Sequence, residues 1–479
     1  MKRPKVIYSQ YQKDIFENIQ NGSGNTVVFA RAGCGKSFCL IEGVKYIPKK
    51  LKSLFVAFNT SVAKELDERI SKSYISARTL HSVGRSTIVN TFGKIVLDPD
   101  KSLNIIQNIL HKRGYKKFDK EKFNIASSLL KAVNLCKGCL IDIPSKIDIL
   151  LDEFDIDTFE LSREEFINII CQSLRECKEV KNVIDYGDMI WLPYVYGMRF
   201  KQYDRVFIDE AHDLNAAQLH IALNSCKKGG RILAVLDDFQ VLYSFTGVKI
   251  DAADILIKRL NAKVLPLPIS YRCPKAVIKL AQEIVPDIQA APNAKEGEVK
   301  VVLENVFLSL VRPGDFILSR VNAPLIYYCM ELIRNKIPAN IAGRDIGRGL
   351  AYLVRKSETK TVNEFLKWLG KWKQEEIDRL KQKGRDPVII LDKAACLENL
   401  CGGKKTTDQI IDDINELFSD ADANDIVVLS SIHRAKGLER DNVFLLDFTL
   451  RRGMNRSEDN IAYVGFTRAR KSLFLVRKG

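Results

Sequence analysis

The sequence predicts an α/β protein with two parallel sheets, each interrupted by a mainly helical stretch. Short apolar or β-branched runs end in polar residues, which is typical of parallel sheets whose strand ends carry a site. These runs are residues 54–58, 205–209, 231–237, 316–319, 426–430, 443–446 and 473–476. They form two groups, one around residues 86–189 and the other around residues 346–424.

The two intervening stretches have helical patterns. Apolar residues in the second follow helical spacing with Lys and Arg between them: Val362, Phe365, Leu366, Leu369 and Trp372. Thr406 and Gln409 resemble a capping box before another apolar series. We therefore expect residues 1–85 and 190–265 to form one α/β domain with the helical insertion 86–189. Residues 266–345 and 425–479 should form the other, with the small helical insertion 346–424.

The charge and hydropathy of the chain indicate which classes of binding partner to expect. The chain has 75 Lys and Arg against 59 Asp and Glu, a net charge of +16, which draws it toward polyanions. Nucleic acid is the first candidate and an anionic membrane surface the second. No apolar stretch approaches the roughly 18 to 20 residues of a membrane span, and no signal-peptide core follows the first residues. We expect no membrane partner and a cytoplasmic location, at a nucleoid or a viral replication site.

Residues 30–37 read Ala-Arg-Ala-Gly-Cys-Gly-Lys-Ser, between an apolar run and a helix-like segment. Gly33 and Gly35 would let backbone N–H groups turn toward one anion, at the positive end of the following helix. Lys36 would reach the β- and γ-phosphates of a nucleotide, and Ser37 would hold Mg²⁺. The alternative is a glycine-rich turn without a ligand.

Asp209 and Glu210 are adjacent carboxylates at the end of an apolar run. In this arrangement one acid can position Mg²⁺ while the next activates water. An isolated acidic pair at a strand end is often a pair of solvent-exposed residues without a catalytic role. The phosphate loop upstream favours the catalytic interpretation here.

Cysteine usage points to free thiols in a reducing compartment, because the 11 cysteines follow no regular framework. Cys136 and Cys139 have metal-ligand spacing, and Cys171 and Cys177 lie in the same region. Their second pair is poorly spaced for a zinc or iron–sulfur site, so buried thiols are favoured.

Further motifs occur in order along the chain. They are Tyr-Ser-Gln-Tyr-Gln at 8–12, Leu-Asp-Asp-Phe-Gln at 236–240, Ser-Tyr-Arg-Cys-Pro at 270–274, Ser-Ile-His-Arg-Ala-Lys-Gly-Leu-Glu at 431–439 and Ala-Tyr-Val-Gly-Phe-Thr-Arg-Ala-Arg at 462–470. Together with the phosphate loop and the acid pair, this series resembles superfamily 1 helicases of the UvrD/Rep/PcrA type. That family also has alanine at the first position of its phosphate loop, as Ala30 is here.

The resemblance implies two RecA-like P-loop NTPase motor domains that use ATP and Mg²⁺. It assigns catalysis to Lys36, Asp209, Glu210, Gln240, Arg272 and Arg468. It assigns nucleotide binding to Gln12, Ala32, Gly33, Cys34, Gly35, Lys36, Ser37, Tyr271, Gly437 and Glu439, and the metal to Ser37 and Asp209. Gln12 would read adenine, Tyr271 would stack on it, and Gln240, Arg272 and Arg468 would face the γ-phosphate. Because the arginines belong to the second domain, hydrolysis would require closure between the two domains.

The resemblance also implies a path for single-stranded nucleic acid. Its expected contacts are Phe58, Asn59, His81, Tyr243, Phe245 and His433, which would stack on bases or bond to the strand. The alternative for Phe58 and Phe245 is that their rings pack in the hydrophobic core and do not contact the strand. Basic residues in both insertions, around 112–122 and 367–385, would contact phosphates or form solvated helix faces.

The resulting expectation is an ATP-dependent helicase or translocase. It would move 3′ to 5′ along single-stranded DNA and unwind duplex DNA in replication, repair or recombination, with unidentified loading or repair partners. Two alternatives stay open: an RNA-directed member of the superfamily, and a nucleotide switch that binds DNA without unwinding it. The second insertion is short for this family, in which it usually forms a sizeable regulatory domain.

Overall fold

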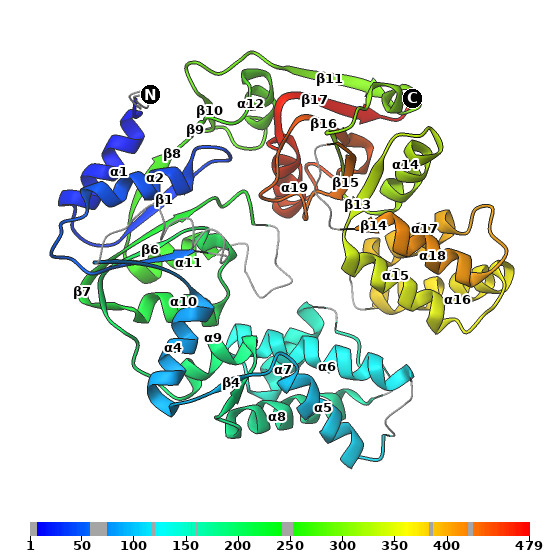
Figure 1. The fold of residues 1–479 in the computed structure, drawn as a ribbon, viewed down its shortest axis with the longest axis horizontal. Helices are drawn as coiled ribbons and strands as arrows, with labels where there is room; N and C mark the ends of the chain where they lie inside the picture. The colour runs from blue at the N-terminus through cyan, green and yellow to red at the C-terminus, as the bar shows by residue number, and fades with distance from the viewer. Residues whose placement is uncertain are drawn as a thin grey trace. The chain divides into compact units, whose positions relative to one another are not determined.

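The computed structural model describes residues 7–57, 74–115, 120–154, 156–159, 161–241, 252–382, 387–419 and 425–479 (Figure 1). The chain divides into two compact units. The first comprises Met1–Arg31 with Gly35–Pro268, and the second Ala32–Cys34 with Ile269–Gly479.

The first unit is built on a 6-stranded parallel sheet with the order β3-β2-β6-β7-β1-β8. Its strands are β1 (Thr26–Ala30), β2 (Ser53–Ala57), β3 (Ile75–Thr79), β6 (Tyr203–Ile208), β7 (Cys226–Leu236) and β8 (Lys263–Leu267). The β-branched and apolar residues of β1 suit a central strand, and its neighbours β7 and β8 pair with it along its length. The predicted α/β class with parallel sheets is confirmed.

Two groups of helices belong to this unit. Those that flank the sheet in sequence are α1 (Gln10–Asn21), α2 (Lys36–Gly43), α4 (Leu80–Phe92), α9 (Tyr186–Val195), α10 (Ala216–Asn224) and α11 (Ala252–Leu260). Between α4 and α9 lie α5 (Lys101–Lys112), α6 (Lys120–Cys139), α7 (Pro144–Glu153) and α8 (Arg163–Glu179), which gather together in Figure 1. These helices share a hydrophobic cluster with residues of α4 and α9, and the cluster includes Ile106, Leu129 and Phe166. The short strands β4 (Val96–Leu97) and β5 (Val183–Ile184), which precede α5 and follow α8 in the sequence, pair with each other.

The second unit has a 7-stranded parallel sheet with the order β11-β17-β16-β12-β15-β13-β14. The strands are β11 (Glu298–Leu303), β12 (Phe316–Ser319), β13 (Ala339–Ala342), β14 (Phe418–Ser419), β15 (Val427–Ser431), β16 (Arg440–Leu446) and β17 (Ala469–Arg477). A short pair, β9 (Ile269–Ser270) and β10 (Gln289–Ala290), precedes it.

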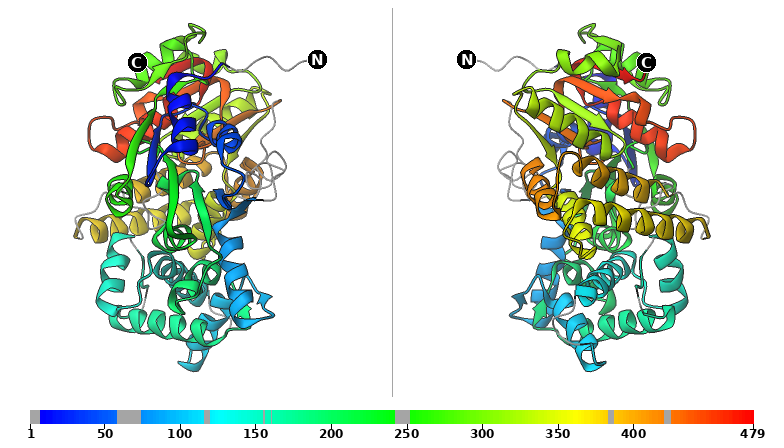
Figure 2. Two further views of the ribbon diagram at one scale, coloured as in Figure 1. Left: turned by 90° about the vertical axis from the view of Figure 1, so that its left-hand side faces the viewer. Right: turned by 90° about the vertical axis from the view of Figure 1, so that its right-hand side faces the viewer.

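The second unit has several helices besides its sheet. They are α12 (Lys275–Ala281), α13 (Glu304–Leu310), α14 (Ala323–Arg334), α15 (Arg344–Lys356), α16 (Val362–Gln382), α17 (Val388–Leu400), α18 (Thr407–Leu417) and α19 (Arg456–Phe466). Helices α15 to α18 lie beside one another, yellow to orange in Figure 2. One cluster joins Phe365 and Ile410 of these helices to Ile317 and Leu429 of the strands. The predicted capping box at the start of α18 is confirmed, since Thr406 and Gln409 exchange both of its hydrogen bonds.

Candidate nucleotide site and its surroundings

The loop between β1 and α2 has the backbone conformation that its glycines predict. Gly33 and Gly35 have φ values of +71° and +77°, in the left-handed region that glycine adopts without strain. Gly35 is the N-cap of α2, which begins at Lys36. The loop therefore ends at a helix N-terminus, where backbone N–H groups and the helix dipole favour an anion.

Lys36 and Ser37 face the two acids that follow β6. The Lys36 Nζ atom lies 2.5 Å from Glu210 Oε2, and the Ser37 hydroxyl donates to Asp209 Oδ2 at 2.9 Å. The Glu210 backbone has φ +50°, in the left-handed region, which is uncommon for a residue with a long side chain. The structure thus brings together the predicted phosphate-loop side chains and the predicted acid pair.

Burial and neighbouring charge shift the ionisation of this cluster. Burial raises the pKa of Asp209 to about 6, and the Glu210 carboxylate raises it too, whereas Lys36 lowers it. Burial by itself lowers the pKa of Lys36, but the carboxylates around it, Glu210 first, outweigh burial and hold it above its usual value. A buried carboxylate beside a second one favours an additional cation. The Ser37 hydroxyl and the Asp209 carboxylate are the hard oxygen ligands that Mg²⁺ prefers.

Gln240 lies in the turn after β7 and is nearly buried. Its Nε2 donates to Asp237 Oδ2 at 2.7 Å, and the Asp237 backbone N–H donates to His212 Nδ1 at 3.2 Å. His212 Nε2 in turn lies 3.6 Å from Glu210 Oε2. The turn that carries Gln240 is therefore connected through Asp237 and His212 to the acid pair. Sequence reasoning gave no role to His212 or Asp237, although His212 lies two residues after Glu210 and Asp237 stands inside the motif at 236–240.

Gln12 lies in the first turn of α1 and is 3% exposed. Its Oε1 accepts a hydrogen bond from the Ser9 backbone N–H at 3.0 Å, and its own N–H donates to Ser9 Oγ. This capping box holds the amide in a fixed orientation, with its Nε2 carrying the hydrogen-bond donors.

In the second unit, Arg272, Glu439 and Arg468 form one charged group. Arg272 pairs with Glu439. Arg468 is 1% exposed, donates to the carbonyls of Val464 and Leu438, and has a pKa lowered to about 10 by burial and by the positive charge of Arg272. The structure thus brings these three predicted residues together.

Tyr271 and Gly437 lie on the same stretches of chain as that charged group. Tyr271 is 48% exposed, next to Arg272, so its ring has an open face. Gly437 has φ +87° in the segment between β15 and β16, where a side chain would strain the turn.

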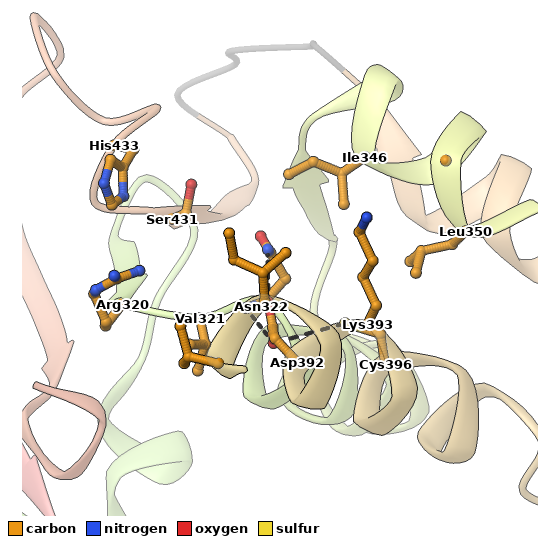
Figure 3. A pocket seen from close by; sticks show the side chains of 13 residues that line it. Arg320, Val321, Asn322, Ile346, Leu350, Asp392, Lys393, Cys396, Ser431 and His433 are labelled. Carbon is orange, nitrogen blue, oxygen red and sulfur yellow. Dashed lines mark hydrogen bonds between the residues drawn. The ribbon is translucent and has the colours of Figure 1, made fainter. Parts of the chain in front are cut away.

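His433 lines a cavity of about 370 Å³ in the second unit. Figure 3 shows its ring near Arg320, with Asp392 and Lys393 of α17 across the cavity. Arg320 forms a salt bridge with Glu458, 2.9 Å between Nη2 and Oε1. Burial and Arg320 lower the pKa of His433 to about 4, so the ring is neutral near pH 7.

The other predicted nucleic-acid contacts are only partly covered by the structure. His81 lies in the first turn of α4, and burial lowers its pKa. Phe58, Asn59, Tyr243 and Phe245 lie outside the described residues.

Some basic residues of the second insertion form ion pairs, whereas others are exposed. In α16, Lys373 pairs with Glu398 and Arg379 with Glu376, while Lys367, Lys371 and Lys381 are exposed. Residues 116–119 and 383–386 lie outside the described part of the chain.

The sequence also raised a possible metal site at the cysteines and a possible membrane partner. Within the described ranges, no group of three or more His, Cys, Asp or Glu side chains has an arrangement for a metal ion. Cys136, Cys139, Cys171 and Cys177 are free thiols. Among the helices that the structure describes, none has the length and apolar character needed to cross a membrane.

Family models match both halves of the chain. The model for the UvrD/REP helicase N-terminal domain matches residues 11–259, and the model for the UvrD-like helicase C-terminal domain matches residues 427–476. The first match alone covers just over half of the 479 residues. The phosphate loop, the acid pair and the turn that carries Gln240 all lie within it.

Individual relatives agree with these models. The chain is 25% identical over 398 residues to the probable DNA helicase II homolog of Mycoplasma capricolum, covering 72% of this chain and 52% of that protein. It is 23% identical over 294 residues to the ATP-dependent DNA helicase PcrA of Bacillus subtilis, covering 56% and 38%. It is 25% identical over 537 residues to the F-box DNA helicase protein 1 of Schizosaccharomyces pombe, covering 97% and 57%. The chain spans about half the length of these curated relatives. With both family models in order along it, the chain belongs to the UvrD/Rep helicase family.

Proposed function

We propose that this protein is an ATP- and Mg²⁺-dependent DNA helicase, which moves 3′ to 5′ along one strand and separates the duplex ahead of it. The observation that carries this proposal is the pairing of Lys36 with Glu210 and of Ser37 with Asp209. A phosphate loop that faces two acids at the end of another parallel strand of the same sheet is the arrangement that nucleotide hydrolysis requires.

In the proposed reaction, Lys36 holds the β- and γ-phosphates, and Glu210 accepts the proton of the attacking water. The short Lys36–Glu210 contact is exchanged when a nucleotide binds, because the ammonium group then turns to the phosphates and leaves the Glu210 carboxylate available as a base. Mg²⁺, when bound by Ser37 and Asp209, would neutralise charge on the phosphate oxygens. Gln240 would orient the water or sense the γ-phosphate.

The second unit would contribute Arg272 and Arg468 to the γ-phosphate, and the open ring of Tyr271 to the adenine. An arginine placed on the transferring group can supply about 10³ to 10⁵ in rate. We further propose Gln12 for the adenine edge, Gly437 for a phosphate and Glu439 for the ribose. Glu439 would have to release Arg272, with which it pairs in the structure.

We propose residues 1–85 and 190–265, and residues 266–345 and 425–479, as the two RecA-like motor domains. Residues 86–189 and 346–424 would be their insertions. His81 and His433 are proposed as strand contacts, with Phe58, Asn59, Tyr243 and Phe245. The DNA substrate is supported by the net charge of +16 and by relatives whose names specify DNA. Acting on DNA, the protein would work in the cytoplasm or at a viral replication site.

The test is ATP hydrolysis by the full chain with no nucleic acid, with single-stranded DNA and with single-stranded RNA. We expect DNA to stimulate turnover more than RNA does, and Glu210→Gln to abolish turnover in all three conditions. Stimulation by RNA alone would assign the chain to RNA. Strand binding without any hydrolysis would make it a nucleotide switch.

A further inference from the structure

Arg31 stands inside the phosphate loop, and the proposed chemistry gives it no role. Its side chain is only 8% exposed. A buried guanidinium is costly unless charged partners compensate for its lost hydration. Arg31 Nη1 lies 2.6 Å from Asp238 Oδ1 and 3.4 Å from Asp237 Oδ1. One cation at the start of the loop thus holds two adjacent acids that lie more than 200 residues later in the chain.

Two aromatic rings flank the same guanidinium. Its central carbon lies 5.0 Å from the centre of the Phe239 ring and 5.8 Å from that of Phe29. Phe29 is on β1, and Phe239 follows β7, the strand next to it. Arg31 is therefore fixed from both strands, by charge and by ring contacts, in a position that few other side chains could occupy.

The contacts continue from Arg31 to Gln240. Asp237 is fully buried, and its two carboxylate oxygens have different neighbours. Oδ1 faces Arg31 and accepts from the Phe239 backbone N–H at 3.2 Å, while Oδ2 accepts from Gln240 Nε2 at 2.7 Å. The orientation of the Gln240 amide thus depends on a carboxylate that Arg31 helps to hold.

We propose that Arg31 is a positioning residue for hydrolysis: it holds the turn of residues 237–240 against the phosphate loop and thereby sets Gln240 for the γ-phosphate. This inference rests on the proposed function. Without Arg31, the adjacent Asp237 and Asp238 carboxylates lose the ion pairs that hold them, their mutual repulsion is less compensated, and the turn relaxes away from the geometry in which Gln240 acts. Lys36 and the loop backbone still bind the nucleotide, so turnover falls while affinity is retained.

A double-mutant cycle on the full chain tests this coupling. The variants are Arg31→Met, Gln240→Ala and the two combined, with kcat and KM for DNA-stimulated ATP hydrolysis and Kd for a fluorescent ATP analogue. Misplacing a catalytic group by about 1 Å costs about 10²-fold in rate, so we expect a loss of that order in kcat for Arg31→Met. Its KM and Kd should stay within about threefold of the parent values, because the mutation removes little ground-state binding. The combined variant should be no slower than Gln240→Ala alone.

Arg31→Lys keeps the charge without the planar fork and should recover part of kcat. Arg163→Met is the matched control. Arg163 also pairs with two acids, Asp148 at 2.6 Å and Asp152 at 3.0 Å, but on helices α7 and α8 away from the loop. The Arg163→Met variant should have the same kcat as the parent protein.

Multiplicative losses in the combined variant would overturn the proposal, since Arg31 would then act independently of Gln240. So would a loss of affinity with kcat unchanged, which would make Arg31 a phosphate ligand. If Arg31→Met does not fold, Asp238→Asn takes its place in the cycle under the same criteria. A parent protein without ATP hydrolysis would instead refute the proposed function.

Discussion

Lys137→Met should strongly destabilise the helices between β3 and β6. Lys137 is fully buried on α6, with its Nζ atom 2.7 Å from Asp188 Oδ1 and 3.1 Å from Asp185 Oδ2. Lys101 on α5 reaches the other oxygen of Asp188 at 2.6 Å. Two ammonium groups thus balance two carboxylates at the start of α9, and the methionine variant would leave one negative charge uncompensated.

The magnitude follows from that burial. Removing one partner of a buried ion pair costs about 3–5 kcal/mol, because the other charge keeps its desolvation cost without its compensation. For a urea slope of about 1–3 kcal/mol per molar, the midpoint should fall by at least about 1 M. Lys137→Met combined with Asp185→Asn should lose less than Lys137→Met alone, since the second change removes the uncompensated charge.

Tryptophan fluorescence during urea unfolding can report on this region. Trp191 on α9 is buried, and Lys137 Nζ lies 5.6 Å from the centre of its ring. The other two tryptophans, Trp368 and Trp372, are replaced by phenylalanine in every protein compared.

The matched control is Lys373→Met, which removes a partly exposed pair with Glu398 and should cost less than about 1 kcal/mol. Equal midpoints for Lys137→Met and this control would refute the reasoning. A combined variant with Asp185→Asn that is less stable than Lys137→Met would refute it too.

The free energy of unfolding of the helices around Lys137 should fall as the pH drops below about 4. The reason is that burial raises the pKa of Asp185 but Lys137 and Ser102 outweigh burial, so this pKa is lowered in the folded state. Trp191 fluorescence can follow this loss of stability in acid, which should be weaker in Lys137→Met. Lys36→Ala should abolish ATP hydrolysis while strand binding and the far-UV spectrum are kept, and full ATPase activity would contradict the site. Arg468→Ala should retain nucleotide affinity but lose turnover by about 10³-fold or more; because Arg468 is buried, thermal unfolding must accompany the kinetics, and unchanged turnover would remove its proposed role.

The strands that sequence reasoning identified were those with continuous apolar runs. Residues 316–319 coincide with β12, because a strand buried on both faces has no polar interruption. Other strands were missed for physical reasons. β8 contains Pro266 and lies at a sheet edge, where a missing N–H is tolerated, and β11 alternates charged and apolar residues as another edge strand.

The candidate site was predictable as far as its motifs extend. Lys36, Ser37, Asp209 and Glu210 were named from spacing, and the structure places them in contact. The role proposed for Arg31 was not predictable, because its partners Asp237 and Asp238 are brought to it only by the pairing of β1 with β7.

The central claim is that nucleotide hydrolysis drives strand separation with a direction. The most direct measurement is ATP-driven displacement of a labelled strand from DNA duplexes that carry either a 3′ or a 5′ single-stranded tail, with Lys36→Ala as the inactive control. We expect displacement from the 3′-tailed duplex, dependent on ATP and Mg²⁺ and absent in the variant. Displacement that persists in Lys36→Ala, or active ATP hydrolysis with no displacement from either duplex, would contradict it.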